Sequence, residues 1–292
     1  MTSVRTSHRG PIPSVALPRR RPSAVIRIPT ESSWPAVRVP DEALAYGFFN
    51  NGAGTHTSRT LMLTEVRGLL TVTSLTVAYS GYQEAAVELN AVNKATLSTR
   101  RKTFRHLREL YGLSPQLRIF RALRDLWAFD PTAQPLLAAS CAMARDPLMR
   151  ASARRIFEAR PDDVVRSQEL SQAVQDSFPD RLRADTLART GRNLASSWTQ
   201  SGHLSGRSRK IRTRPPTTPE ATAYALFLGH LCGDRGDGLF RSIWARLCDA
   251  PEHVLRIQAQ VAARLGYLEY RQAGMVTEVG FSHLQRPEEG PS

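Results

Sequence analysis

A stretch in the second half of the chain has the side chains best suited to binding nucleic acid. Residues 186–216 contain seven basic residues and no Asp or Glu. Leu187, Gly191, Leu194, Ala195 and Trp198 recur at helical spacing, so they predict a helix whose apolar side packs into the core, with Trp198 among the core residues. The opposite side carries residue types that contact phosphates and base edges, namely Arg189, Arg192, Asn193, Ser196 and Gln200. We therefore expect a recognition helix here.

The segment that follows this helix is also basic and ends in proline. We expect its basic residues to follow a DNA backbone or enter the minor groove, as a wing does; they are Arg207, Arg209, Lys210, Arg212 and Arg214. The alternative is an ordinary solvated helix face beside a basic loop. Solvated faces usually mix the two charge signs, and this region does not, which favours the binding interpretation.

A second basic helix is predicted at residues 97–111. Leu97, Phe104, Leu107 and Tyr111 form its apolar stripe, and Arg100 lies toward that stripe. The other side carries Ser98, Arg101, Lys102, Arg105 and Arg108. A short helix at 82–89 and a turn at 90–96 precede it, which is the order of a helix-turn-helix motif. A basic surface helix without a ligand is the alternative.

The net charge of the chain is unevenly distributed. The 292 residues carry +14, while residues 1–40, 94–108 and 186–216 alone carry +6, +6 and +7, so the rest of the chain is acidic. A preference for Arg over Lys reflects codon bias, but codon bias does not cluster charge. This clustering is typical of proteins that bind polyanions. Aromatic residues are few, at 7%, which argues against a stacking surface for single strands, although RNA stays open.

Catalytic signatures are absent from the sequence. It has no GxxxxGK[ST] loop, no GxSxG elbow and no HExxH motif, and the histidines have no assignable partners. Cys141, Cys232 and Cys248 lack CxxC pairing, so we expect buried free thiols in a reducing cytosol and neither a metal site nor a cofactor. No apolar run approaches the roughly 18 residues of a membrane span. We expect a cytoplasmic protein that is not an enzyme.

The predicted fold is mainly α, with two helix-turn-helix or winged-helix-like helical domains and a small C-terminal β-hairpin. Residues 1–40 read as a disordered basic arm, 41–163 and 164–285 as the two domains, and 286–292 as a tail. Further helices are expected at 57–70, 115–128, 131–145, 147–159, 164–176, 185–201, 219–231, 239–249 and 252–265, and strands at 267–271 and 275–281. The last helix has Val254, Ile257, Val261 and Leu265 on one face, for which we expect a packing role.

Four segments resemble a known family. They are YQEAAVELNAVNKATLSTRRKTFRHLRELYGL, IFRALRDLWAFD, LLAASCAMARDPLMR and TLARTGRNLASSWTQSGHLSG, and together they are similar to the BrxA family of bacterial BREX phage-exclusion systems. The resemblance spans residues 44–285 and implies a mostly helical DNA-binding component of an anti-phage operon. Such a component has no catalytic role and works beside a methyltransferase, an ATPase and a PglZ-type protein. The chain departs from the family in its basic arm and in its Arg-rich segment after Gly206, and no site residue is transferred.

These observations together predict sequence-tolerant binding of double-stranded DNA, mainly through phosphate contacts, within a phage-defence assembly. One alternative is a protein–protein scaffold subunit of such an assembly. Another is a DNA-binding transcriptional regulator, which would bind a palindromic site as a dimer. An enzyme would need a metal or a nucleophile that the sequence does not reveal.

Overall fold

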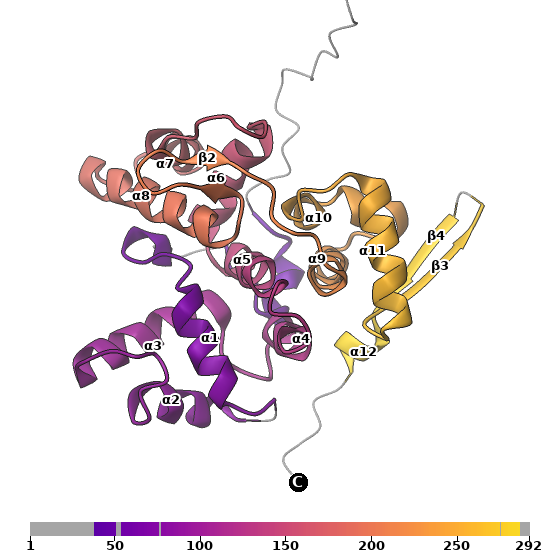
Figure 1. The fold of residues 1–292 in the computed structure, drawn as a ribbon, viewed down its shortest axis with the longest axis horizontal. Helices are drawn as coiled ribbons and strands as arrows, with labels where there is room; N and C mark the ends of the chain where they lie inside the picture. The colour runs from indigo at the N-terminus through magenta and orange to yellow at the C-terminus, as the bar shows by residue number, and fades with distance from the viewer. Residues whose placement is uncertain (1–37, 51–53, 76, 275, 287–292) are drawn as a thin grey trace, which may run out of the picture. The chain divides into compact units, whose positions relative to one another are not determined.

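The structure, a computed structural model, describes residues 38–50, 54–75, 77–274 and 276–286, which belong to one compact unit. It is mainly helical, with a small two-stranded antiparallel sheet near the C-terminus, as the sequence predicts (Figure 1). Most of the predicted basic arm and tail, together with Met275 of the last predicted strand, lies outside the described residues.

The first half of the chain folds into helices joined by short connections. In chain order they are the 3-10 helices η1 (Asp41–Tyr46) and η2 (Thr55–Thr57), followed by α1 (Leu63–Val72), α2 (Tyr79–Val87), α3 (Leu97–Tyr111), α4 (Arg118–Trp127), α5 (Gln134–Arg145) and α6 (Pro147–Glu158). The α3 helix has the predicted bounds because a capping residue stands at each of its ends. The Thr96 side chain accepts from the Thr99 amide at 3.2 Å, and Gly112 ends the helix with a positive φ.

The second half alternates helices with two short hairpins. Its elements are α7 (Ser167–Ser177), α8 (Ala184–Gln200), β1 (Leu204–Ser205), β2 (Ile211–Arg212), α9 (Pro219–Leu231), η3 (Gly236–Arg241), α10 (Ile243–Leu247), α11 (Glu252–Arg264), β3 (Glu269–Ala273), β4 (Val276–Gly280) and α12 (Ser282–Gln285). Both β1–β2 and β3–β4 are antiparallel. The β1–β2 hairpin follows α8 where a wing is predicted.

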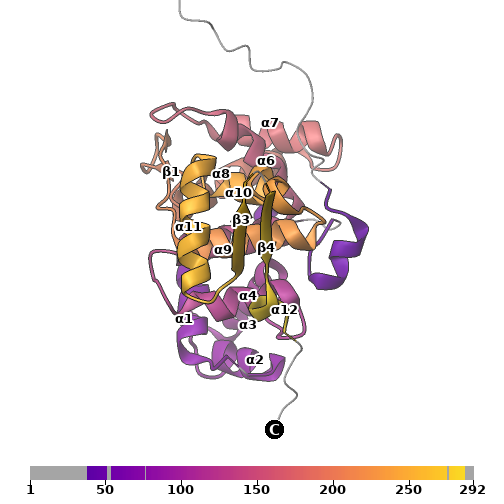
Figure 2. The ribbon, with the colours of Figure 1, turned by 90° about the vertical axis from the view of Figure 1, so that its right-hand side faces the viewer.

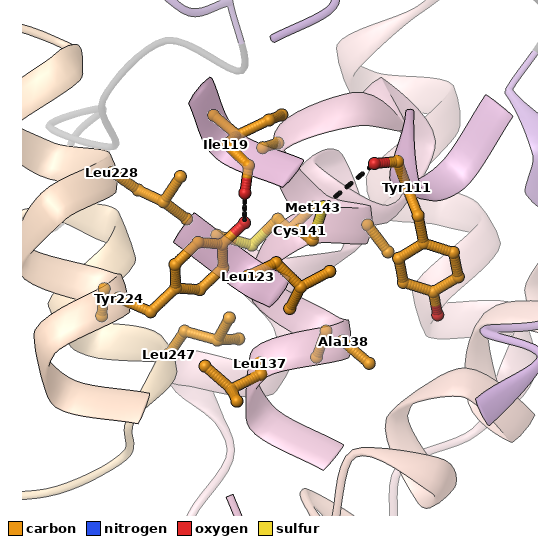
Figure 3. Close-up of a cluster of buried hydrophobic side chains, with 14 of the residues drawn as sticks. Tyr111, Ile119, Leu123, Leu137, Ala138, Cys141, Met143, Tyr224, Leu228 and Leu247 are labelled. Atoms are coloured by element: carbon orange, nitrogen blue, oxygen red, sulfur yellow. Dashed lines mark hydrogen bonds between the residues drawn. The ribbon is translucent and has the colours of Figure 1, made fainter. Parts of the chain in front are cut away.

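Helices α5 and α9 form the centre of the core and pack against each other (Figure 1). Nearly every residue along both is buried, which is what helices that are apolar on all sides require. Figure 3 shows side chains of α5 and α9 in this core, where α9 also contacts α4: the Tyr224 hydroxyl donates to the Ile119 carbonyl at 2.8 Å. Because α5 precedes residue 163 and α9 follows it, the core bridges the predicted domain boundary.

The three cysteines are free, as expected. Cys141 and Cys248 are buried and Cys232 is half-buried. Burial raises the pKa of the Cys141 thiol to about 11 and that of the other two to about 12. In Figure 3 the Cys141 thiol lies inside the core near the Tyr111 carbonyl. Since the thiolate is the reactive form, these thiols contribute to packing and are unreactive near neutral pH.

The α7–α8 pair and the β1–β2 hairpin are held closely together. A Cβ on Gly191 of α8 would lie 2.3 Å from the Ser167 carbonyl oxygen of α7, so the two helices cross at a distance that only glycine permits. The chain before α7 joins the hairpin through a bridge between Val164 and Ile211 and through the Val165 amide, which donates to the Lys210 carbonyl at 3.0 Å. The hairpin is therefore fixed relative to the first turn of α7.

The last long helix buries a different face from the one expected. Leu255, Ala259 and Ala262 are the buried positions of α11, and β3 packs beside this helix (Figure 2). The predicted packing face points outward instead: Ile257 is 55% exposed and Leu265 52% exposed, while Val254 and Val261 are half-buried. Small residues face the core here because α11 packs closely against α9.

Candidate nucleic-acid interface

Helix α8 has the predicted apolar side, since Leu194, Ala195 and Trp198 are buried. The Trp198 indole donates to the Ser152 hydroxyl at 2.9 Å, which confirms it as a core residue. On the other side Arg189 and Arg192 are exposed. The Arg189 Nε donates to the Thr57 carbonyl at 3.0 Å, which holds this guanidinium along η2.

Two polar residues predicted for base contacts are engaged within the protein. The Asn193 amide donates to the His56 carbonyl at 2.9 Å. Gln200 accepts from the Leu63 amide at 3.0 Å, which caps α1, and donates to the Thr60 hydroxyl at 3.0 Å. Their side chains therefore hold the 54–63 segment against α8. The sequence pattern does not show this because the partners lie about 140 residues away.

The β1–β2 hairpin presents most of its predicted basic residues. Arg207, Arg209 and Arg214 are exposed, and Lys210 is half-buried with its ammonium donating to the Gly206 carbonyl at 2.7 Å. Partial burial lowers the pKa of Lys210.

Arg212 requires a correction, because it is only 2% exposed and cannot follow a DNA backbone. Its Nε donates to the Ile156 carbonyl at 3.0 Å, and its Nη1 lies 2.9 Å from the Asp249 carboxylate. Alternation along the short strand β2 points this side chain inward.

A cavity of about 560 Å³ lies where α8, the hairpin and the start of α7 meet. Arg192, Ala195 and Ser196 line it from α8. The hairpin contributes Arg207, Ser208, Arg209 and Lys210, and the chain entering α7 contributes Val164, Val165, Arg166, Ser167 and Gln168. Five of these residues are basic, and none of the described residues lining the cavity is acidic. The structure thus brings predicted residues from both α8 and the hairpin into one concave basic surface.

The two carboxylates that directly flank the lining residues 164–168 in sequence, those of Asp163 and Glu169, are directed to other partners. The Asp163 carboxylate accepts from the Arg160 amide at 2.8 Å. Glu169, in the first turn of α7, accepts from the Arg166 amide at 2.6 Å and pairs with Arg155 at 2.9 Å. Among the described residues, no carboxylate forms an ion pair with any of the five basic residues of the cavity. Sequence reasoning missed Arg166 because it lies outside the acid-free stretch.

The second predicted site, on α3, is also exposed. Ser98, Arg101, Lys102, Arg105 and Arg108 all lie on its solvent side, and Phe104, Leu107 and Tyr111 are buried beneath them. Arg100 turns back toward the preceding turn, where it donates to the carbonyls of Lys94 and Val87 at 3.0 and 3.3 Å. The side chain that departs from the basic face thus stabilises the α2–α3 connection.

One short segment, η2, contacts both basic helices. The Thr55 hydroxyl donates to Glu109 of α3 at 3.0 Å, while Arg189 of α8 bonds the Thr57 carbonyl. Figure 1 shows η2 as the small indigo turn between α3 and α8. The two predicted sites, about ninety residues apart in the chain, are therefore joined through a common support.

His56, the central residue of η2, belongs to a buried array with Asp146 and Ser197. The His56 Nδ1 is 2.7 Å from the Asp146 Oδ2, and its Nε2 is 2.9 Å from the Ser197 hydroxyl. Burial raises the pKa of Asp146, but the His56 ring and the amides of His56 and Leu148 outweigh it and lower the pKa below its usual value.

The same order of groups activates serine in hydrolases. Here His56 and Ser197 are 0% exposed, and the Ser197 oxygen also accepts from the Leu61 amide at 2.8 Å. None of the three lines the basic cavity. We assign the array to packing, since a nucleophile needs access to substrate.

No family model and no curated protein matches this chain. The interpretation of the site therefore depends on its geometry. In the part of the chain that the structure describes, no group of three or more His, Cys, Asp or Glu side chains is arranged to hold a metal ion. None of the described helices has both the length and the apolar character that crossing a bilayer requires.

Proposed function

We propose that this protein binds double-stranded DNA through its phosphates, using the basic surface of α8, the β1–β2 hairpin and α3. The observation that carries the proposal is the cavity whose lining has five basic residues and no acidic one. Arginine and lysine side chains neutralise phosphates and release counterions, which supplies most non-specific affinity for duplex DNA.

The hydrogen bonds of α8 favour sequence-tolerant binding. Asn193 and Gln200 would be the adenine readers of the helix, but both are committed to bonds within the protein. The residues left exposed are mainly arginines, which position a protein on the backbone. A role in a phage-defence assembly, beside a methyltransferase, an ATPase and a PglZ-type protein, is part of the proposal and is supported by the sequence resemblance alone.

The test is binding of the full chain to a random-sequence duplex at about 50 and 200 mM salt. Each phosphate contact should change the affinity roughly threefold over this range. We expect the double variant Arg207→Glu/Arg209→Glu to lose at least about tenfold in affinity at the lower salt. A matched control with the same charge change, Arg264→Glu/Arg271→Glu, alters exposed residues of α11 and β3 and should bind almost normally. Equal losses in both variants would contradict a localised site.

A scaffold function is the second candidate, and the exposed face of α11 favours it. Ile257 and Leu265 are more than half exposed and share this face with Val254 and Val261, which suits a protein partner. If the protein binds no duplex at either salt concentration, DNA binding is refuted and the scaffold function is the candidate that remains. A transcriptional regulator would be indicated by binding about a thousandfold tighter to a palindromic site than to the random duplex.

A further inference from the structure

The cavity between α8, the hairpin and α7 has features that go beyond a general basic surface. We infer that it binds a phosphate monoester, the group found at the 5′ end of a nucleic-acid strand and on a free nucleotide. This inference rests on the proposed phosphate-binding surface and specifies the ligand of its concave part.

The charge of the cavity matches a monoester better than an internal phosphodiester. Arg166, Arg192, Arg207, Arg209 and Lys210 converge from three segments of the chain. An internal diester carries one negative charge, whereas a monoester carries about 1.5 to 2 near neutral pH and has three strong acceptor oxygens. The forked guanidinium groups can each donate two hydrogen bonds to such oxygens.

The shape of the cavity imposes a second condition. Its walls are held in place, because the hairpin is bonded to residues 162–165 and α8 meets α7 at Gly191. A monoester has one organic substituent, which can leave through the mouth while the phosphate lies within. The exposed arginines around the cavity can still contact the internal phosphodiesters of a duplex, as the proposed function requires, while the recess itself accepts a terminal phosphate.

Two further features define what is recognised. Ser167 and Gln168 of the first turn of α7 line the cavity, and their side chains bring a hydroxyl and an amide donor beside the arginines. The apolar lining residues are Val164, Val165 and Ala195, and no described lining residue is aromatic. Without a stacking surface, the phosphate is recognised and the base is not.

The experiment compares a single-stranded oligonucleotide carrying a 5′-phosphate with the same oligonucleotide carrying a 5′-hydroxyl, both binding the full chain. We expect the 5′-phosphate to raise affinity at least about tenfold, as charged hydrogen bonds of this kind do. If free nucleotides also enter the cavity, adenosine and uridine 5′-monophosphate should compete equally well with the 5′-phosphorylated oligonucleotide. If only strand ends enter the cavity, neither nucleotide should compete. Either outcome supports a monoester site and identifies its source.

The variant Arg166→Ala/Arg192→Ala should abolish the preference for the 5′-phosphate, while the matched control Arg264→Ala/Arg271→Ala keeps it. Equal affinity of the native protein for the two oligonucleotides would overturn the inference. A covalently closed circular duplex, which has no strand ends, separates this inference from the proposed function. If the protein binds the circle but shows no preference for the 5′-phosphate, only the monoester site is refuted. If it prefers the 5′-phosphate but does not bind the circle, only duplex binding is refuted.

Discussion

Replacing Asp146 by alanine tests how the buried array supports the interface. One carboxylate oxygen accepts from the Leu148 amide at 2.9 Å and caps α6. The other accepts from the His56 amide at 3.0 Å and lies 2.7 Å from the His56 ring. Asp146 thereby ties the segment under both basic helices to the start of α6, and it is only 2% exposed. We expect its removal to lower the free energy of unfolding.

The magnitude follows from the two kinds of contact that are lost. A lost N-cap costs about 1 kcal/mol. Removing the buried carboxylate also leaves the His56 amide and ring without their acceptor, and hydrogen bonds to a charged group contribute about 1.5–3 kcal/mol each. Because the contacts share one carboxylate, the two costs are not simply additive, and we expect about 4 kcal/mol for Asp146→Ala. Thr96→Ala, which removes only the exposed cap of α3, should cost about 1 kcal/mol.

Urea unfolding followed by tryptophan fluorescence provides the measurement, because Trp198 and Trp244 are both buried. The difference between the two variants, about 3 kcal/mol, represents the hydrogen bonds with His56. A loss for Asp146→Ala no larger than that for Thr96→Ala would refute this reasoning.

The pH dependence of the same variant gives a second check. The pKa of Asp146 is depressed in the folded state, so its stabilisation is complete well above its unfolded pKa of about 3.9. It is lost as the pH falls through that value and through the lower folded pKa. The difference between native protein and Asp146→Ala should therefore shrink from about pH 5 to pH 3. A constant difference would show that the carboxylate charge does not contribute.

Two further predictions concern the helices around the cavity. Gly191→Ala should destabilise the protein by about 2 kcal/mol and weaken binding of the 5′-phosphate, because the new Cβ would meet the Ser167 carbonyl at 2.3 Å. Gly238→Ala, which has open space around its Cβ, is the control, and equal urea midpoints would contradict the close crossing. Burial lowers the pKa of His203 to about 3, so the unfolded chain takes up a proton below about pH 6.5 that the folded protein does not. Stability should therefore fall from about pH 6.5 toward pH 4, and the decline should be shallower in His203→Gln when urea midpoints are measured across this range.

Local signals in the sequence determined much of the helical framework. Helices α3 and α9 have the predicted bounds, residues 97–111 and 219–231, because the Thr96 and Thr218 side chains cap their first turns and Gly112 ends α3. The apolar side of α8 was predicted because leucine and tryptophan recur there at helical spacing, and one side was clearly apolar. Caps and periodicity act within a few residues of the chain, so the sequence displays them directly.

The packing of distant segments decided the features of the fold and the site that the sequence did not predict. Periodicity identified an apolar stripe on α11, but small residues on another face allowed the closer approach to α9, which left Ile257 exposed. Basic composition identified the hairpin, but only pairing with residues 162–165 showed that Arg212 turns inward. The cavity joins three separate segments of the second half of the chain, and the Asp146–His56–Ser197 array joins residues that lie far apart in the sequence. Their geometry depends on how helices cross in three dimensions, and a linear pattern carries no information about that crossing.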